Sequence, residues 1–144
     1  MSEGALLLDT HVWFWLAEAT PGKLSPSCLE KIRAASLTSD LLISAISVWE
    51  VANLDAKKRV LLSLACHDWV REALRGPGIE LADLSPEIAI DSTRLPGVFH
   101  ADPADRILVA TARNRNAVLV TADRAIIEYS RARQVRVLDA RARE

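Results

Sequence analysis

The stretch Leu6-Leu7-Leu8-Asp9-Thr10 places three apolar residues directly before a carboxylate. An uninterrupted apolar run of this length is typical of a strand that is covered on both faces within a parallel sheet. A similar stretch, Val118-Leu119-Val120, leads through Thr121 and Ala122 to a second carboxylate, Asp123. The two stretches therefore predict two buried parallel strands, each followed by an acidic residue at its carboxyl end.

Further short apolar runs alternate with amphipathic stretches along the rest of the chain. Strands are expected at residues 5–8, 41–43, 79–84, 117–120 and 135–138. Helices are expected at residues 11–19, 25–35, 45–58, 67–75, 102–114 and 124–131, with one more starting at 85. This alternation predicts the α/β class, as a three-layer α/β/α sandwich around a central, mainly parallel sheet. Ligands of such folds bind beyond the carboxyl ends of the strands.

Length and composition narrow the class of protein. The chain has 144 residues, of which 50% are hydrophobic, and we expect one domain spanning 1–144. A formal net charge of −1 excludes a polycationic nucleic-acid binder. However, residues 106–144 carry nine Arg against four acidic residues. We expect most of these Arg side chains to form a solvated surface, with contacts to phosphate or to an acidic partner segment as the alternative.

The cysteine count and hydropathy suggest where the protein acts. Cys28 and Cys66 are the only cysteines, and without a CxxC spacing they make neither a disulfide framework nor a zinc site. The first residues show no basic region followed by an apolar stretch and a cleavage site, so we expect no secretion, and no apolar run reaches the roughly 18 residues of a membrane span. We therefore expect a cytoplasmic protein with no membrane association.

Two acidic residues are expected at the start of the helix from residue 102. Asp102 is suited to cap it, with Pro103 as the first helical residue. Capping explains Asp105 less well, because its spacing places it on the same helix face as Leu108 and Val109. A carboxylate at the head of a buried stripe is costly unless donors or a cation match it. We therefore favour a functional role for Asp105.

Glu50 has two local interpretations. In one, Ser47 caps the helix and Glu50 reaches back to it in a capping box. In the other, the helix begins after Ser44, and Glu50 points out of its second turn. A helical wheel places Trp49 on the apolar face of this helix, together with Ala45, Ala52 and Ala56, and Glu50 at the edge of that face.

The acidic residues are expected to converge. Asp9 and Asp123 follow strands directly, and each could also cap the next helix, whereas Glu50 and Asp105 lie near helix starts. Right-handed crossovers bring these points to one edge of a parallel sheet. Clustered carboxylates repel one another, and a hard divalent cation relieves that repulsion. An oxygen-only site favours Mg²⁺ over zinc and suits metal-assisted attack on a phosphodiester.

Four segments carry a resemblance to a known family. They are Leu6-Leu7-Leu8-Asp9-Thr10-His11, Ile43-Ser44-Ala45-Ile46-Ser47-Val48-Trp49-Glu50, His100-Ala101-Asp102-Pro103-Ala104-Asp105-Arg106 and Leu119-Val120-Thr121-Ala122-Asp123. In order and spacing they resemble the PIN-domain ribonucleases and, more narrowly, the VapC toxins of type II toxin–antitoxin systems. The resemblance covers nearly the whole chain.

The resemblance implies a PIN-like fold and a Mg²⁺-dependent endoribonuclease that hydrolyses RNA phosphodiesters, with Mn²⁺ as an alternative to Mg²⁺. It implies a homodimer inhibited by a cognate antitoxin protein. The acidic catalytic and metal site would comprise Asp9, Glu50, Asp105 and Asp123, with Asp9 and Asp105 as the direct metal ligands. The supporting residues would be Thr10, Asp102, Arg106 and Thr121. For Arg106, an ion pair with an acidic neighbour and a contact with RNA phosphate both remain open.

Other functions stay open at this stage. A non-catalytic module that binds RNA or a partner would keep the fold without the chemistry. A DNA nuclease would have the same phosphodiester chemistry on a different nucleic acid. A phospho-acceptor receiver domain is disfavoured, because it needs a Lys after a late strand and every Lys here lies at or before residue 58. His11 and His100 lie beside acidic motifs and are alternative general acids, although the metal scheme needs neither.

Overall fold

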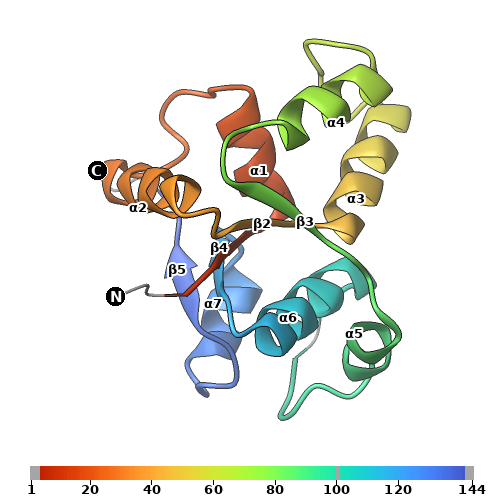
Figure 1. The fold of residues 1–144 in the computed structure, drawn as a ribbon. Coiled ribbons are helices and arrows are strands. Elements are labelled where there is room, and N and C mark those ends of the chain that lie inside the picture. The colour runs from red at the N-terminus through yellow and green to blue at the C-terminus, as the bar shows by residue number, and fades with distance from the viewer. Residues whose placement is uncertain (1–3, 100, 142–144) are drawn as a thin grey trace.

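The computed structural model describes residues 4–99 and 101–141, which form a β-sheet with helices on both faces (Figure 1). The strands are β1 (Leu6–Leu8), β2 (Leu41–Ser44), β3 (Ile79–Ala82), β4 (Val118–Thr121) and β5 (Val137–Asp139). The helices are α1 (Thr10–Ala17), α2 (Pro26–Leu37), α3 (Ala45–Ala56), α4 (Cys66–Leu74), α5 (Pro86–Asp91), α6 (Pro103–Arg115) and α7 (Arg124–Ser130). The predicted α/β/α class and the predicted order of elements are confirmed.

The sheet is parallel throughout and has the strand order β3-β2-β1-β4-β5. Strand β1 is central, and its last residue, Leu8, is in register with Ile43 of β2 and Val120 of β4. The chain therefore leaves these three strands side by side at the same edge of the sheet. The residues that come directly after β1, β2 and β4 are brought close together in this way.

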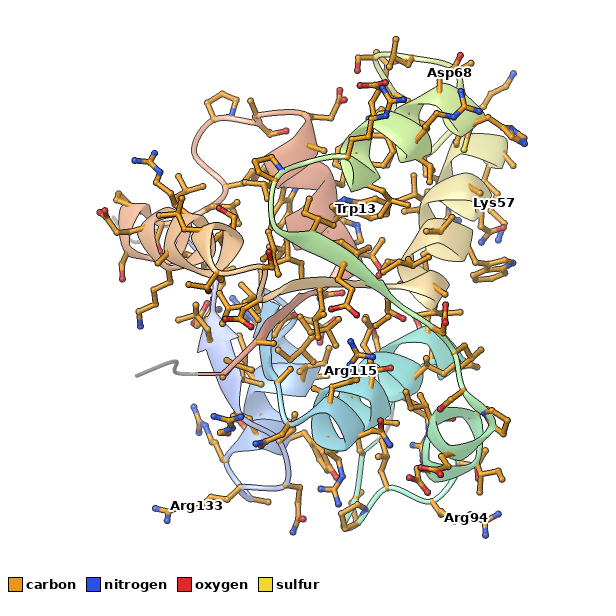
Figure 2. The ribbon with its side chains drawn as sticks, viewed as in Figure 1. Trp13, Lys57, Asp68, Arg94, Arg115 and Arg133 are labelled. Carbon is orange, nitrogen blue, oxygen red and sulfur yellow. The ribbon has the colours of Figure 1, made fainter. Side chains whose placement is uncertain are left out.

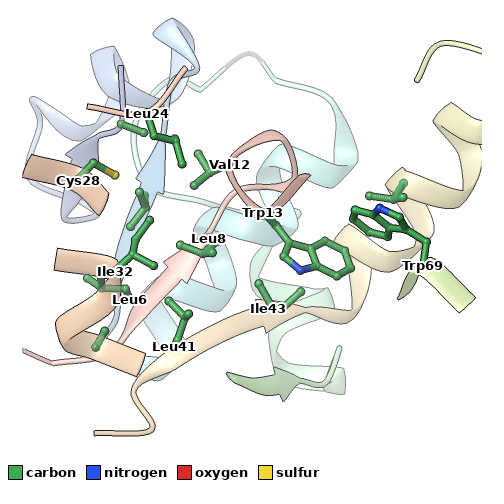
Figure 3. Packing of buried hydrophobic residues seen from close by; sticks show 14 residues of the cluster. Leu6, Leu8, Val12, Trp13, Leu24, Cys28, Ile32, Leu41, Ile43 and Trp69 are labelled. Atoms are coloured by element: carbon green, nitrogen blue, oxygen red, sulfur yellow. The ribbon is translucent and has the colours of Figure 1, made fainter. Parts of the chain in front are cut away.

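Each face of the sheet has its own core, because side chains alternate along a strand. Leu8 of β1 belongs to one core with Trp13 of α1, Ile32 of α2 and Trp69 of α4 (Figure 3). Leu7 points to the opposite face, in a second core formed with helices α5, α6 and α7. The rings of Trp13 and Trp69 meet edge to face at 5.1 Å between centroids. All three layers thus depend on the short central strand.

Side-chain oxygens satisfy the free N–H groups at most helix starts. The capping residues are Asp9 for α1, Ser25 for α2, Ser44 for α3, Ser85 for α5, Asp102 for α6 and Asp123 for α7. Helix α4 is the exception, since Ala65 offers no side-chain acceptor.

None of the helices in residues 4–99 and 101–141 combines the length and apolar character that a membrane span requires.

Helix α3 corrects the helical-wheel expectation. Trp49, predicted on the apolar face, is 58% exposed, whereas Val51 is buried in the core shared by α1 and α4. The capping-box interpretation is also wrong, since the Ser44 hydroxyl accepts a hydrogen bond from the N–H of Ile46 at 3.1 Å. A helix that starts at Ala45 leaves Ser47 and Glu50 free for other contacts.

We predict that Leu8→Ala lowers the free energy of unfolding by about 3–4 kcal/mol, because it removes a fully buried side chain from the central strand. Leu81→Ala is the matched control, because Leu81 lies on the edge strand β3 and is 42% exposed. Its expected cost is below about 1 kcal/mol. Urea unfolding followed by circular dichroism measures both, and equal losses would contradict the assignment of β1 as the structural centre.

Candidate functional site

Asp9 occupies the carboxyl end of the central strand and is only 6% exposed. Both of its carboxylate oxygens are bound. Oδ1 accepts from the backbone N–H of Thr10 at 2.7 Å, and Oδ2 accepts from the hydroxyl of Thr121 at 2.6 Å. Burial raises the pKa of Asp9, and these two hydrogen bonds and the nearby His11 oppose that rise. The carboxylate is therefore held in one orientation at the edge of the sheet.

Thr121 connects Asp9 to the next strand along the sheet. Its hydroxyl donates to Asp9 and accepts from the backbone N–H of Asp123 at 3.0 Å. Asp123 in turn caps α7 by accepting from the N–H of Ile126 at 3.1 Å. The capping role expected for Asp123 is present, and it places a carboxyl group two residues beyond β4, beside the end of β1.

Glu50 reaches the same place from α3. Its Oε1 accepts from the Thr10 hydroxyl at 2.5 Å. Burial raises the pKa of Glu50, and the charges of Asp9 and Asp102 raise it further. Thr10 thus holds Asp9 through its backbone N–H and Glu50 through its hydroxyl.

The charges of the other acidic residues all act on Asp105. It lies in the first turn of α6, where its own N–H donates to the capping carboxylate of Asp102 at 2.9 Å. Partial burial is the largest cause that raises the pKa of Asp105, to about 8. The further causes are the negative charges of Asp102, Asp9, Asp123 and Glu50. The four carboxylates singled out from the sequence therefore act on one another electrostatically.

The acidic group offers the oxygen atoms that a hard cation binds, although its side chains are too far apart to enclose one. Within the described residues, no three His, Cys, Asp or Glu side chains are close enough together to hold a metal ion. Yet every influence that shifts the pKa of Asp105 raises it. Oxygen ligands and uncompensated negative charge are what Mg²⁺ prefers, and Mg²⁺ keeps several waters and so needs few direct protein ligands. The acidic group therefore fits such an ion.

Arg106 does not join this group in the structure. Its Nε donates to the carbonyl of Ser92 at 2.8 Å, and its Nη1 donates to the carbonyl of Phe99 at 2.7 Å. These bonds attach α6 to the segment before it through backbone carbonyls, and not through the acidic partner that was one expectation.

His11 is exposed and lies against the Trp15 ring, with 5.9 Å between centroids. His100 lies outside the described residues.

Several arginines of the C-terminal third hold elements together. Arg113 donates to the carbonyl of Gln134, Arg136 to the carbonyl of Asn116, and Arg115 pairs with Glu80 at 3.3 Å. Arg133, by contrast, projects away from the fold (Figure 2). Arg113, Arg115, Arg133 and Arg136 are all exposed, as expected of a solvated arginine surface, and three of them also make surface contacts.

Ser47 is a residue of the site that sequence reasoning missed. It is fully buried on α3, and its Oγ lies 2.8 Å from the Thr10 Oγ1. The spacing from Ser47 to Glu50 is the only local signal in the sequence, and a capping box has the same spacing.

A cavity of about 650 Å³ lies elsewhere, between α1, α2 and α4. Trp13, Ile32 and Trp69 are among its lining residues, and none of Asp9, Glu50, Asp102, Asp105 and Asp123 is among them. The cavity is therefore separate from the acidic group.

Known proteins are similar to this chain in sequence and in fold. Residues 6–132 match the model of the PIN domain family. The chain is 33% identical over 132 residues to Ribonuclease VapC22 of Mycobacterium tuberculosis, a match that covers 92% of this chain and 97% of that protein.

Among solved structures, VapBC2 from Rickettsia felis bound to a promoter DNA fragment has a TM-score of 0.66 at 17% identity. That match covers 93% of this chain and 97% of the other. DNA-bound VapBC from Salmonella typhimurium also has a TM-score of 0.66, at 20% identity, covering 94% and 97%. With the carboxylates at the predicted edge of the predicted sheet, these similarities show that the chain belongs to the PIN-domain family and, within it, is similar to the VapC proteins.

Proposed function

We propose that this chain is a divalent-metal-dependent endoribonuclease and the toxin of a type II toxin–antitoxin pair. The observation that carries the proposal is the acidic group at the carboxyl ends of β1 and β4. Burial and four neighbouring carboxylates there raise the pKa of Asp105. The 33% identity to a VapC ribonuclease over most of the chain supports the same activity. Hydrolysis of a phosphodiester needs such a group, because charge must be stabilised on the phosphoryl oxygens.

Asp9 and Asp105 are the proposed direct ligands of Mg²⁺, for which Mn²⁺ could substitute, and Glu50 and Asp123 complete the acidic site. A bound divalent ion there would lower the pKa of water and stabilise charge on the phosphoryl oxygens. The chain's own contribution is orientation. Thr121 and the Thr10 N–H hold the Asp9 carboxylate, and the Thr10 hydroxyl holds Glu50 Oε1. Asp102 keeps the first turn of α6 in place, and with it Asp105.

We predict that the purified protein cuts RNA in the presence of Mg²⁺ or Mn²⁺ and that EDTA abolishes cutting. Asp9→Asn should lower the cleavage rate at least about 100-fold, because it halves the charge that two direct ligands present to the cation. Cleavage of structured and unstructured RNA, followed on denaturing gels, measures the effect.

Asp68→Asn is the matched control for Asp9→Asn. Asp68 is an exposed α4 carboxylate paired with Arg71, so its change to amide should leave cleavage unchanged. A DNA substrate of the same sequence belongs in the assay, since cleavage of DNA alone would point to a DNA nuclease. Folded protein that binds RNA but cuts neither substrate, with or without metal, would favour the non-catalytic module.

The pKa of Asp105 leads to a pH prediction. A carboxyl with a pKa of about 8 is protonated at pH 6, and a cation must displace that proton before it binds. The affinity for Mg²⁺ should therefore rise about tenfold or more from pH 6 to pH 8. Isothermal titration calorimetry measures this, and Asp105→Asn should remove most of the pH dependence. A constant affinity in the unmodified protein across this range would show that Asp105 is not a ligand.

The partner proposals rest on the relatives and on the cavity. Solved structures with this fold include a toxin–antitoxin complex from Klebsiella pneumoniae and DNA-bound VapBC from Salmonella typhimurium. We propose that a cognate antitoxin protein binds this chain, and the largely apolar cavity between α1, α2 and α4 is a surface suited to an apolar segment. We further propose that the protein acts in the cytoplasm and that residues 1–144 form one domain.

We also propose a homodimer, in line with the resemblance to the VapC toxins. Light scattering on the purified protein should give about twice the chain mass of 15.8 kDa. A mass equal to one chain at micromolar concentration would contradict the dimer without affecting the nuclease assignment.

A further inference from the structure

Ser47 is a buried hydroxyl whose position no local requirement explains. The N-cap of α3 is Ser44, so Ser47 lies in the first turn of the helix and does not cap it. Ser47 is 0% exposed, and a hydroxyl buried in this way is normally hydrogen-bonded. Its oxygen lies 2.8 Å from the Thr10 hydroxyl, which belongs to α1, 37 residues earlier in the chain.

Counting protons gives the direction of these hydrogen bonds. The Thr10 hydroxyl has one proton and lies within hydrogen-bonding distance of both Ser47 Oγ and Glu50 Oε1. In its ionised form, the form that a cation binds, the Glu50 carboxylate only accepts, so the Thr10 proton points to Glu50. Ser47 must then donate its own proton to Thr10. The hydroxyls form a chain in which each bond polarises the next, from Ser47 through Thr10 to Glu50.

The chain of hydroxyls ties the two sides of the site together. Ser47 and Glu50 are three residues apart and share a face of α3, while Thr10 lies on α1 and also holds Asp9 through its N–H. Without Ser47, the Thr10 oxygen would lose the donor that polarises it, and its own bond to Glu50 would weaken. The Glu50 carboxylate would then be held less firmly beside Asp9.

We propose that Ser47 is a positioning residue of the nuclease site, which orients Glu50 by directing the Thr10 hydroxyl toward it. The inference rests on the proposed function for its catalytic consequence, but the orientation of Glu50 can be observed without catalysis.

The structural test is a crystal structure of metal-free Ser47→Ala beside that of the unmodified protein. The bond between Thr10 Oγ1 and Glu50 Oε1 should lengthen beyond 3.5 Å, or the Glu50 side chain should occupy more than one rotamer. An unchanged Glu50 with the bond still near 2.5 Å would overturn the proposal, whether or not the protein cuts RNA.

The kinetic test is a double-mutant cycle with Thr10→Val, which removes the hydroxyl but keeps the backbone N–H that binds Asp9. Ser47→Ala alone should lower kcat for RNA cleavage about tenfold with little change in KM. In the Thr10→Val background it should have no further effect on kcat. Independent, multiplying effects would overturn the proposal, because Ser47 would then not act through Thr10.

Ser130→Ala is the matched control, since the Ser130 hydroxyl bonds only within its own helix, to the carbonyl of Ile127. It should leave kcat unchanged. If Ser47→Ala does not fold cooperatively, Ser47→Cys, a weak donor of similar volume, takes its place in the cycle with the same expected outcomes. Absence of cleavage by the unmodified protein would contradict the proposed function and leave the structural test of Ser47 standing.

Discussion

The buried carboxylate of Asp9 is the point from which the site is organised. It lies at the end of the central strand, where burial disfavours its charge, and it is retained there by donors from two elements, the Thr10 N–H and the Thr121 hydroxyl. An unsatisfied carboxylate in this position would be costly. The two bonds therefore fix the relative positions of β4 and the start of α1 as well as the direction of the Asp9 oxygens. Glu50 is added to this arrangement through the same Thr10.

Burial of Asp105 and repulsion from its acidic neighbours make the stability of the fold depend on pH. Because the pKa of Asp105 is raised from 3.8 to about 8, the folded state disfavours its ionised form. Stability that is present below the unfolded pKa is thus lost as the pH rises through the folded pKa. At neutral pH most of that stability is already lost, and the fold is held by its two large apolar cores. A cation bound only by the folded protein would reverse this effect, so metal binding and stability are expected to be linked.

Capping and membership of the acidic group coincide in this fold for a geometric reason. Asp9, Asp102 and Asp123 each cap a helix and also belong to the acidic group or its surroundings. In a parallel sheet with right-handed crossovers, helices begin where strands end, so their N-termini gather at the edge that binds ligands. A local capping role and a place in the site are therefore compatible for each acid, and the sequence around a single residue does not separate them.

The sequence by itself determined the class of fold, the order of elements and the acids that gather at one edge, because apolar runs, caps and helix starts depend on residues within a few positions of one another. The Asp102-Pro103 start of α6 is predictable in this way. Other features were decided only by the tertiary structure, because they depend on residues far apart in the chain. Thr121 reaches Asp9 across 112 positions, and Thr10 reaches Glu50 across 40. The exposure of Trp49, the carbonyl contacts of Arg106 and the burial of Ser47 likewise depend on which helix packs against which, and local periodicity does not contain that information.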